Sequence, residues 1–142
     1  MLSQPIRSIM KRRSFVTASP QTTVRKAAEM MADRHVGAVV VVEDRHLVGI
    51  FSERDAVTRV VARGLEPDTT RLADVMTPAP VTVAPDRSYG HAISLMHERG
   101  FRHLPVVDNG TPIGIVSSRS ALDPELEDFA CEERRRLRFQ QG

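Results

Sequence analysis

The amino-acid sequence repeats itself, and this repeat constrains the fold more than any other feature. Residues 16–57 align without a gap on residues 81–122, at a constant offset of 65 positions. Thirteen of these 42 positions are identical, which indicates a duplication rather than chance. Upstream, the sequence IRSIM at residues 6–10 pairs with LADVM at residues 72–76, at an offset of 66. We therefore expect two copies of one structural unit.

The hydrophobic pattern predicts the same elements in both copies. A short extended segment ends at Pro20 or Pro85 and is followed by a helix with apolar residues at helical spacing. Two strands joined by a polar turn come next, and a helix that starts near Ser52 closes the first copy, with Ala56, Val57, Val60 and Val61 on its apolar side. The predicted fold is α/β (α+β), with two pseudo-symmetric β-α-β-β-α repeats packed sheet to sheet.

Each copy of about 60 residues is too small to bury a comfortable core alone, so the two are expected to share one. We predict a first repeat with its N-terminal segment at residues 1–66 and a second repeat at residues 67–123. Residues 124–142 are predicted as a C-terminal helix and basic tail, because Asp123 and Pro124 suit a helix start. Gly100 is expected to end the main helix of the second repeat.

Composition narrows the class of protein. The net charge is only +2, so the basic run RRRLR at residues 134–138 is interpreted as a solvated helix end, with a nucleic-acid patch as the alternative. The longest apolar run, VGAVVVV at residues 36–42, is far shorter than the ~20 residues that span a bilayer. A single cysteine, Cys131, excludes an internal disulfide and fits a reducing compartment. These features predict a cytoplasmic protein without membrane contact.

No arrangement of residues indicates catalysis. The five histidines show no i, i+4 pairing, and no Cys-His cluster accompanies them, so we expect no metal site. The sequence has no Gly-x-Ser-x-Gly elbow, phosphate-loop lysine motif or His-Glu-x-x-His. We therefore expect a protein that is not an enzyme.

The heptapeptide GIFSERD at residues 49–55 returns as GIVSSRS at residues 114–120, and it supports two interpretations. Ser52 and Asp55 have the spacing of a capping box, and a glycine in the strand lets another backbone come close. Alternatively, the helix start and Arg54 suit a phosphate, while Asp55 suits the vicinal diol of a ribose. Ser120 cannot supply that carboxylate, so we expect one good nucleotide site and one weaker or altered site.

The duplicated unit, with GIFSERD and with GFRHLPVVD at residues 100–108, resembles a pair of cystathionine-β-synthase-type (CBS) domains of the stand-alone bacterial kind. The resemblance covers about residues 5–122, and the family's ribose-phosphate motif falls on Gly49, Ile50, Ser52 and Asp55. It implies a regulatory module that binds AMP, ADP, ATP, NAD(H) or S-adenosylmethionine between its repeats. It also implies a homodimer that acts on an unidentified regulated protein.

The resemblance implies ligand-binding residues from both repeats. For the first site they are Ile50, Ser52, Arg54, Asp55, Thr77, Val81, Phe101, Arg102 and His103. For a second, weaker site they are Val16, Val36, Ser117, Arg119 and Ser120. His103 together with Ser117 is also expected to serve that second cleft, and Arg102 either cleft. Phe101 has a place in the core as its alternative, and Arg102 and His103 are otherwise exposed strand-end residues. Two other functions remain open: a structural dimerisation module without ligand, and a nucleic-acid binder.

Overall fold

A computed structural model describes residues 2–10 and 15–118 of the chain. The predicted C-terminal helix and the basic run at residues 134–138 lie outside the described residues. In chain order the elements are α1 (Ile6–Met10), β1 (Thr17–Ala18), α2 (Val24–Arg34), β2 (Ala38–Glu43), β3 (His46–Ser52), α3 (Glu53–Asp55), the π-helix η1 (Ala56–Val61), α4 (Leu72–Val75), β4 (Thr77–Pro78), α5 (Tyr89–Arg99), β5 (His103–Asp108) and β6 (Thr111–Ser117).

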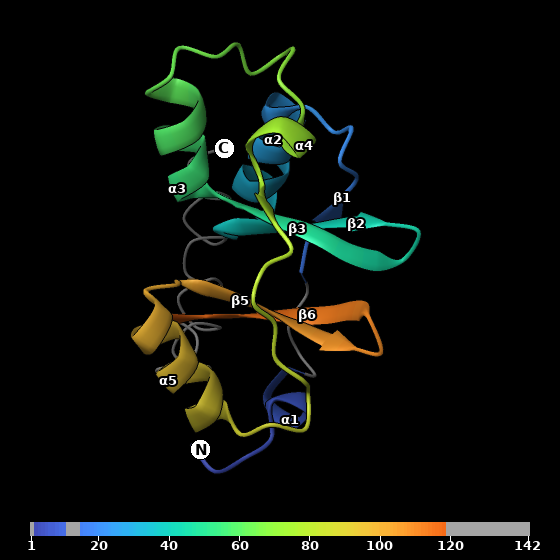
Figure 1. Ribbon diagram of the computed structural model, residues 1–142, viewed down its shortest axis with the longest axis vertical. Coiled ribbons are helices and arrows are strands. Elements are labelled where there is room, and N and C mark those ends of the chain that lie inside the picture. Colours follow the sequence, from blue (N-terminus) through green and yellow to red (C-terminus); the bar gives the residue numbers. More distant parts are fainter. Residues whose placement is uncertain (1, 11–14, 119–142) are drawn as a thin grey trace, which may run out of the picture.

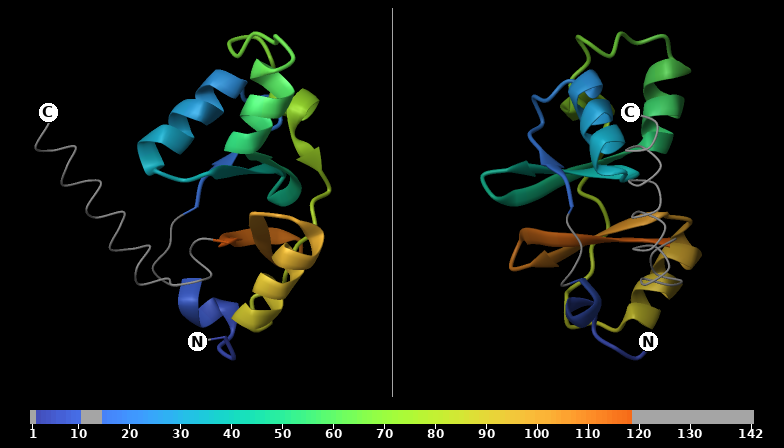
Figure 2. Two further views of the ribbon diagram at one scale, coloured as in Figure 1. Left: turned by 90° about the vertical axis from the view of Figure 1, so that its left-hand side faces the viewer. Right: turned by 180° about the vertical axis from the view of Figure 1, so that it is seen from behind.

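Two β-sheets face each other in the middle of the molecule, and the helices cover their outer faces (Figures 1 and 2). The first sheet has the strand order β1-β2-β3-β4, and the second consists of β5 and β6. The turns of the two hairpins touch, because the Leu47 N–H donates to the Gly110 carbonyl over 3.3 Å. This arrangement confirms the predicted mixed fold of two repeats packed sheet to sheet.

The repeat in the sequence is also a repeat in the structure. The bounds of α2 and α5, of β2 and β5, and of β3 and β6 each differ by the same 65 positions. Thr23 and Ser88 cap the two main helices by accepting a backbone N–H three residues later. Gly100 ends α5 in the left-handed conformation, as predicted, whereas the equivalent position in α2 is His35 at φ 55°. One local pattern therefore specifies both copies.

The two short helices are exchanged between the units. Leu72 of α4 is fully buried in the core of the first unit, and Ile6 of α1 is fully buried in the core of the second. Matching hydrogen bonds hold them, from Leu72 N–H to the Thr22 carbonyl and from Ile6 N–H to the Arg87 carbonyl, both at 2.9 Å. Figure 1 shows α4 beside the upper sheet and α1 beside the lower one. Each core is thus completed by a segment that precedes the other unit in sequence. The described residues form one core in each unit, so the expectation of a single shared core was wrong.

Two details differ from the predicted elements. The first strand of each repeat is shorter than expected, since β1 has two residues and its counterpart is a single bridge between Val83 and Val106. The helix after Ser52 buries Val60, but Val57 and Val61 are 59% and 70% exposed. Consecutive helical residues point in different directions, so Ala56 and Val60 pack against the core while their neighbours Val57 and Val61 point away from it. No helix among the described residues is long and apolar enough to cross a membrane.

Candidate functional site

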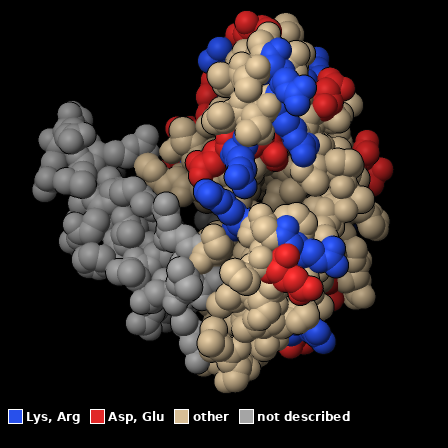
Figure 3. Space-filling model, turned by 60° about the vertical axis from the view of Figure 1, so that its left-hand side comes forward, with Lys and Arg blue, Asp and Glu red and all other residues tan. Residues whose placement is uncertain are grey.

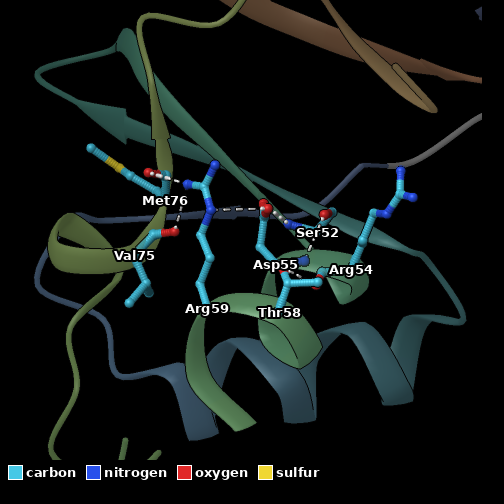
Figure 4. Close-up of polar contacts among 7 residues, drawn as sticks. All are labelled: Ser52, Arg54, Asp55, Thr58, Arg59, Val75 and Met76. Carbon is cyan, nitrogen blue, oxygen red and sulfur yellow. Dashed lines mark hydrogen bonds and ion pairs between the residues drawn. The ribbon is translucent and has the colours of Figure 1, made fainter. Parts of the chain in front are cut away.

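The heptapeptide GIFSERD lies where strand β3 ends and helix α3 begins. The Ser52 hydroxyl accepts the Asp55 backbone N–H over 3.2 Å, and Asp55 Oδ2 accepts the Ser52 backbone N–H over 3.0 Å (Figure 4). These reciprocal bonds satisfy two N–H groups that the helix itself leaves unpaired. The capping-box interpretation is therefore confirmed. It leaves the second carboxylate oxygen, Oδ1, outside the cap.

Gly49 makes room for the segment that joins the repeats. A Cβ atom at this position would lie 2.4 Å from the sulfur of Met76, and Pro78 of β4 pairs with Gly49 across the sheet. Gly114 has the same role in the second unit, where a Cβ would lie 2.6 Å from the sulfur of Met10. The close approach expected at this glycine is therefore made by a methionine side chain as well as by a neighbouring backbone.

A pocket of about 400 Å³ opens between the two units, beside the end of β3. Figure 3 shows a hollow between the upper and lower halves of this face, with basic side chains at its edge. All nine residues predicted for the first site line this one pocket, and they come from both repeats. The complete lining is Ile50, Ser52, Glu53, Arg54, Asp55, Arg59, Thr77, Ala79, Pro80, Val81, Gly100, Phe101, Arg102 and His103. Their contact with a ligand stays a prediction.

Part of the pocket wall is apolar. Ile50 comes from β3, Val81 from the segment after β4, and Phe101 from the segment between α5 and β5. Phe101 is 38% exposed, so it is a wall residue rather than a core residue. Exposed aromatic and aliphatic groups that line a concave site suit the flat face of a base.

Charged groups from both repeats meet in the same pocket. Glu53 and His103 lie together beside Gly37, where a Cβ would be 3.0 Å from His103 Nε2 and 3.2 Å from Glu53 Oε1. Burial is the main effect on the pKa of His103 and lowers it, and the positive charge of Arg102 lowers it further. The carboxylates of Glu53 and Asp55 act in the opposite direction, but the net pKa is lowered. His103 is therefore neutral at pH 7, whereas Arg54, Arg59 and Arg102 are exposed cations that line the pocket.

The structure adds Arg59 to the predicted residues. Its Nε lies 3.7 Å from Asp55 Oδ1, and its Nη1 donates to the carbonyls of Val75 and Met76 over 3.1 Å each (Figure 4). The sequence contained a signal for this contact, because Asp55 and Arg59 are spaced i, i+4 on a predicted helix. Other lining residues that the sequence did not single out are Glu53, Ala79, Pro80 and Gly100.

The structure describes three of the five candidates for a second site, namely Val16, Val36 and Ser117. Val16 is 5% exposed and belongs to the core of the first unit, and Val36 packs against the same core. Ser117 ends β6 opposite His103, which places His103 at the first pocket as well as beside this strand end. Arg119 and Ser120 lie outside the described residues. The second site therefore stays a prediction.

Among the described residues, no three His, Cys, Asp or Glu side chains gather where they could hold a metal ion. The pocket instead combines an apolar wall, the carboxylates of Glu53 and Asp55, of which Asp55 accepts the Ser52 N–H, and exposed guanidinium groups. This set suits a ligand that has a flat apolar part, hydroxyl groups and a negative charge.

Comparison with known proteins identifies the repeat. The family model described as "CBS domain" matches residues 6–62 and 72–124. A protein of Methanopyrus kandleri is 37% identical over 132 residues, which are 92% of this chain and 67% of that protein. Three other curated relatives are much longer, and the chain spans only 18% to 24% of their length.

Solved structures agree with the family match. A protein with CBS domains from Burkholderia ambifaria superposes with a TM-score of 0.80 at 30% identity, covering 88% of this chain and 96% of that one. A CBS domain protein from Pyrobaculum aerophilum, complexed with AMP, superposes with a TM-score of 0.74 at 28% identity. That match covers 81% of this chain and 88% of the other.

Proposed function

The chain belongs to the CBS domain family, with two CBS domains in tandem, and we propose that it is a regulatory module that binds an adenine nucleotide between them. The observation that carries this proposal is a pocket that both repeats line, with the Ser52–Asp55 motif on one side and residues 100–103 on the other. The AMP complex of the related P. aerophilum protein supports an adenine nucleotide as the ligand class.

The ribose is expected to lie against Asp55. Oδ2 of this carboxylate already accepts the Ser52 N–H, while each carboxylate oxygen has two lone-pair sites. Oδ1 can therefore accept from the two hydroxyls of a ribose without breaking the helix cap. The Asp55 side chain is 15% exposed, so these bonds would form where water competes little.

The base and the phosphate follow from the remaining walls. The adenine is expected against Ile50, Val81 and Phe101, where its flat face would bury apolar surface. Arg54 and Arg102 supply the positive charge for the phosphate, and charge-assisted bonds of this kind are stronger than neutral ones. Repeat one thus recognises the sugar, and repeat two contributes most of the base and phosphate contacts.

Regulation follows from a ligand that touches both repeats. Such a ligand favours one packing of the repeats only by as much as it binds that packing better than another. The proposal therefore includes a shift, on ligand binding, from one packing of the two repeats to another. A homodimer partner or a regulated protein would detect this shift. It assigns no reaction to the chain.

Thermal unfolding with AMP, ADP, ATP, NADH and S-adenosylmethionine tests the proposal. A ligand at about 100 times its Kd adds ~2.7 kcal/mol to the free energy of unfolding. For a chain of this size that raises Tm by several degrees, at ~2–4 °C per kcal/mol. Asp55→Asn should remove most of the rise, whereas the matched control Ser120→Ala should keep it. No rise with any of the five ligands would contradict the proposal.

The capping box favours one competing function, a structural dimerisation module in which Ser52 and Asp55 only stabilise a helix start. Under that alternative, Asp55→Ala lowers Tm by the same amount with and without nucleotide. Under the proposed function, the drop is larger when nucleotide is present, because the ligand's stabilisation is lost as well. The same melting experiment therefore separates the two.

A further inference from the structure

Arg59 connects two parts of the molecule that the binding motif alone does not link. Its Nη1 donates to the main-chain carbonyls of Val75 and Met76, at the C-terminal end of α4. Its Nε faces Asp55 Oδ1 at 3.7 Å, one helical turn away on the same chain segment. The guanidinium therefore lies between a carboxylate of the first repeat and the backbone that leads into the second (Figure 4).

The backbone that Arg59 contacts continues into a wall of the pocket. Thr77 follows Met76 directly, and Ala79, Pro80 and Val81 come after Pro78; these four residues line the pocket. Ala79 adopts a left-handed φ of 44°, and its N–H donates to the Val48 carbonyl over 3.1 Å. A strained residue held by a specific hydrogen bond indicates that the path of this wall is tightly specified. Arg59 holds the start of that path.

The second repeat does not keep this connection in its sequence. At the offset of 65 positions, Asp55 corresponds to Ser120 and Arg59 to Pro124. The segment that Arg59 contacts, residues 72–76, does have its counterpart in residues 6–10. Both charged members of the pair are therefore specific to the first repeat, while the segment that receives the hydrogen bonds is common to both.

We infer that Arg59 is a positioning residue that orients the Asp55 carboxylate toward the ribose and ties it to the segment joining the repeats. This inference rests on the proposed function. Only a planar guanidinium can face a carboxylate with Nε and bond two carbonyls with Nη1, because its donors point in fixed directions. Recognition of the sugar hydroxyls is thereby coupled to the position of the wall formed by residues 77–81.

Calorimetric affinities for AMP and for 2′,3′-dideoxy-AMP test this role. The wild-type chain is expected to bind AMP roughly tenfold or more tightly than the dideoxy compound. The dideoxy compound lacks the two hydroxyls that would donate to the charged Asp55 carboxylate. In Arg59→Met the affinity for AMP should fall and this preference should shrink to about two- to threefold, since Asp55 is no longer oriented. Arg59→Lys should restore part of the preference, because it keeps the positive charge beside Asp55.

Arg63→Met is the matched control, since Arg63 lies one turn further along and is not among the residues that line the pocket. It should keep the wild-type preference. If Arg59→Met lowered the affinities for both ligands by the same factor, or lowered neither affinity, Arg59 would only support the wall. The inference would then be overturned. If Arg59→Met does not fold, a wild-type preference in Arg59→Lys overturns it equally. A wild-type chain that binds neither ligand, and whose Tm none of the five adenine-bearing ligands raises, would overturn the proposed function itself.

Discussion

The two repeats agree in packing and differ in chemistry. Their main helices and hairpins have the same bounds at an offset of 65, with the same strand bulge and the same kind of helix cap. Yet Asp55 and Arg59 correspond to Ser120 and Pro124, so the second copy has neither charged group of the pair. After a duplication, apolar and glycine positions that maintain the fold can persist while a few polar positions change. The comparison shows that the shared packing of the two repeats does not require the charged pair of Asp55 and Arg59.

The two repeats contribute different parts of the pocket lining. Repeat one supplies the carboxylate of Asp55, and repeat two supplies Phe101, Arg102 and His103. At the corresponding positions repeat one has Val36, Gly37 and Ala38. The opposite combination, residues 117–120 with residues 36–38, therefore lacks both the carboxylate and the cationic strand end. The second cleft that the resemblance implies would therefore differ from the first on both of its sides.

The exchange of short helices gives the largest expected effects. Ile6→Ala and Leu72→Ala should each lower the free energy of unfolding by ~2–5 kcal/mol, because each leaves a cavity in a different core. Hydrogen exchange locates the damage: Ile6→Ala should expose the amides of β5 and β6, and Leu72→Ala those of β2 and β3. Faster hydrogen exchange in β2 and β3 after Ile6→Ala would contradict the finding that α1 packs against the second unit.

The two strand glycines test the same comparison at a finer level. Gly49→Ala should cost ~1–3 kcal/mol, because the new methyl group overlaps the Met76 side chain. Urea unfolding of Gly49→Ala with Met76→Ala should show a smaller loss than the sum of the single changes. When Gly49→Ala is combined with Met10→Ala, the two losses of unfolding free energy should add. For Gly114→Ala we expect the opposite: a combined loss smaller than the sum with Met10→Ala, and additive losses with Met76→Ala. Coupling of Gly49 to Met10 would rule out the observed packing.

The pH dependence of binding is the smallest expected effect. Burial lowers the pKa of His103, so it is neutral in the free protein, and a phosphate beside it would favour its protonated form. AMP affinity should therefore rise by roughly threefold from pH 8 to 6.5, through uptake of up to one proton. His103→Gln should flatten this dependence, and the exposed His97→Gln should not. An unchanged slope in His103→Gln would place the phosphate elsewhere.

The lowered pKa of His103 also makes a contribution to the loss of stability in acid. Because the folded form of His103 binds its proton less readily than the unfolded form, the free protein should lose stability as the pH falls below ~6.5. AMP should reduce this loss, since bound phosphate raises the proton affinity of the folded form. Tm measured against pH, with and without AMP, follows both effects.

Local patterns made most of the fold predictable. The helical spacing before Met31 and Met96, the hairpins and the Ser52–Asp55 cap are all short-range features, and they are confirmed. The exchange of α1 and α4 was not predictable, because IRSIM and LADVM are alike and nothing in either indicates which sheet it covers. That choice depends on how the chain crosses between the units, which is a long-range property.

The site could be predicted as a set but not in its internal contacts. The nine first-site residues were drawn from three stretches, residues 50–55, 77–81 and 101–103, and the structure brings them into one pocket. Arg59 was missed because i, i+4 ion pairs are common on helix surfaces and do not by themselves indicate a site. Ala79 and Pro80 were missed because they lie in the segment between the aligned repeats, where no internal comparison is available.

A calorimetric titration with AMP that counts strong sites per chain tests the asymmetry of the two clefts most directly. The account predicts one strong site per chain, lost in Asp55→Asn and retained in Ser120→Ala. Two equivalent sites per chain, or a strong site that survives Asp55→Asn, would contradict it.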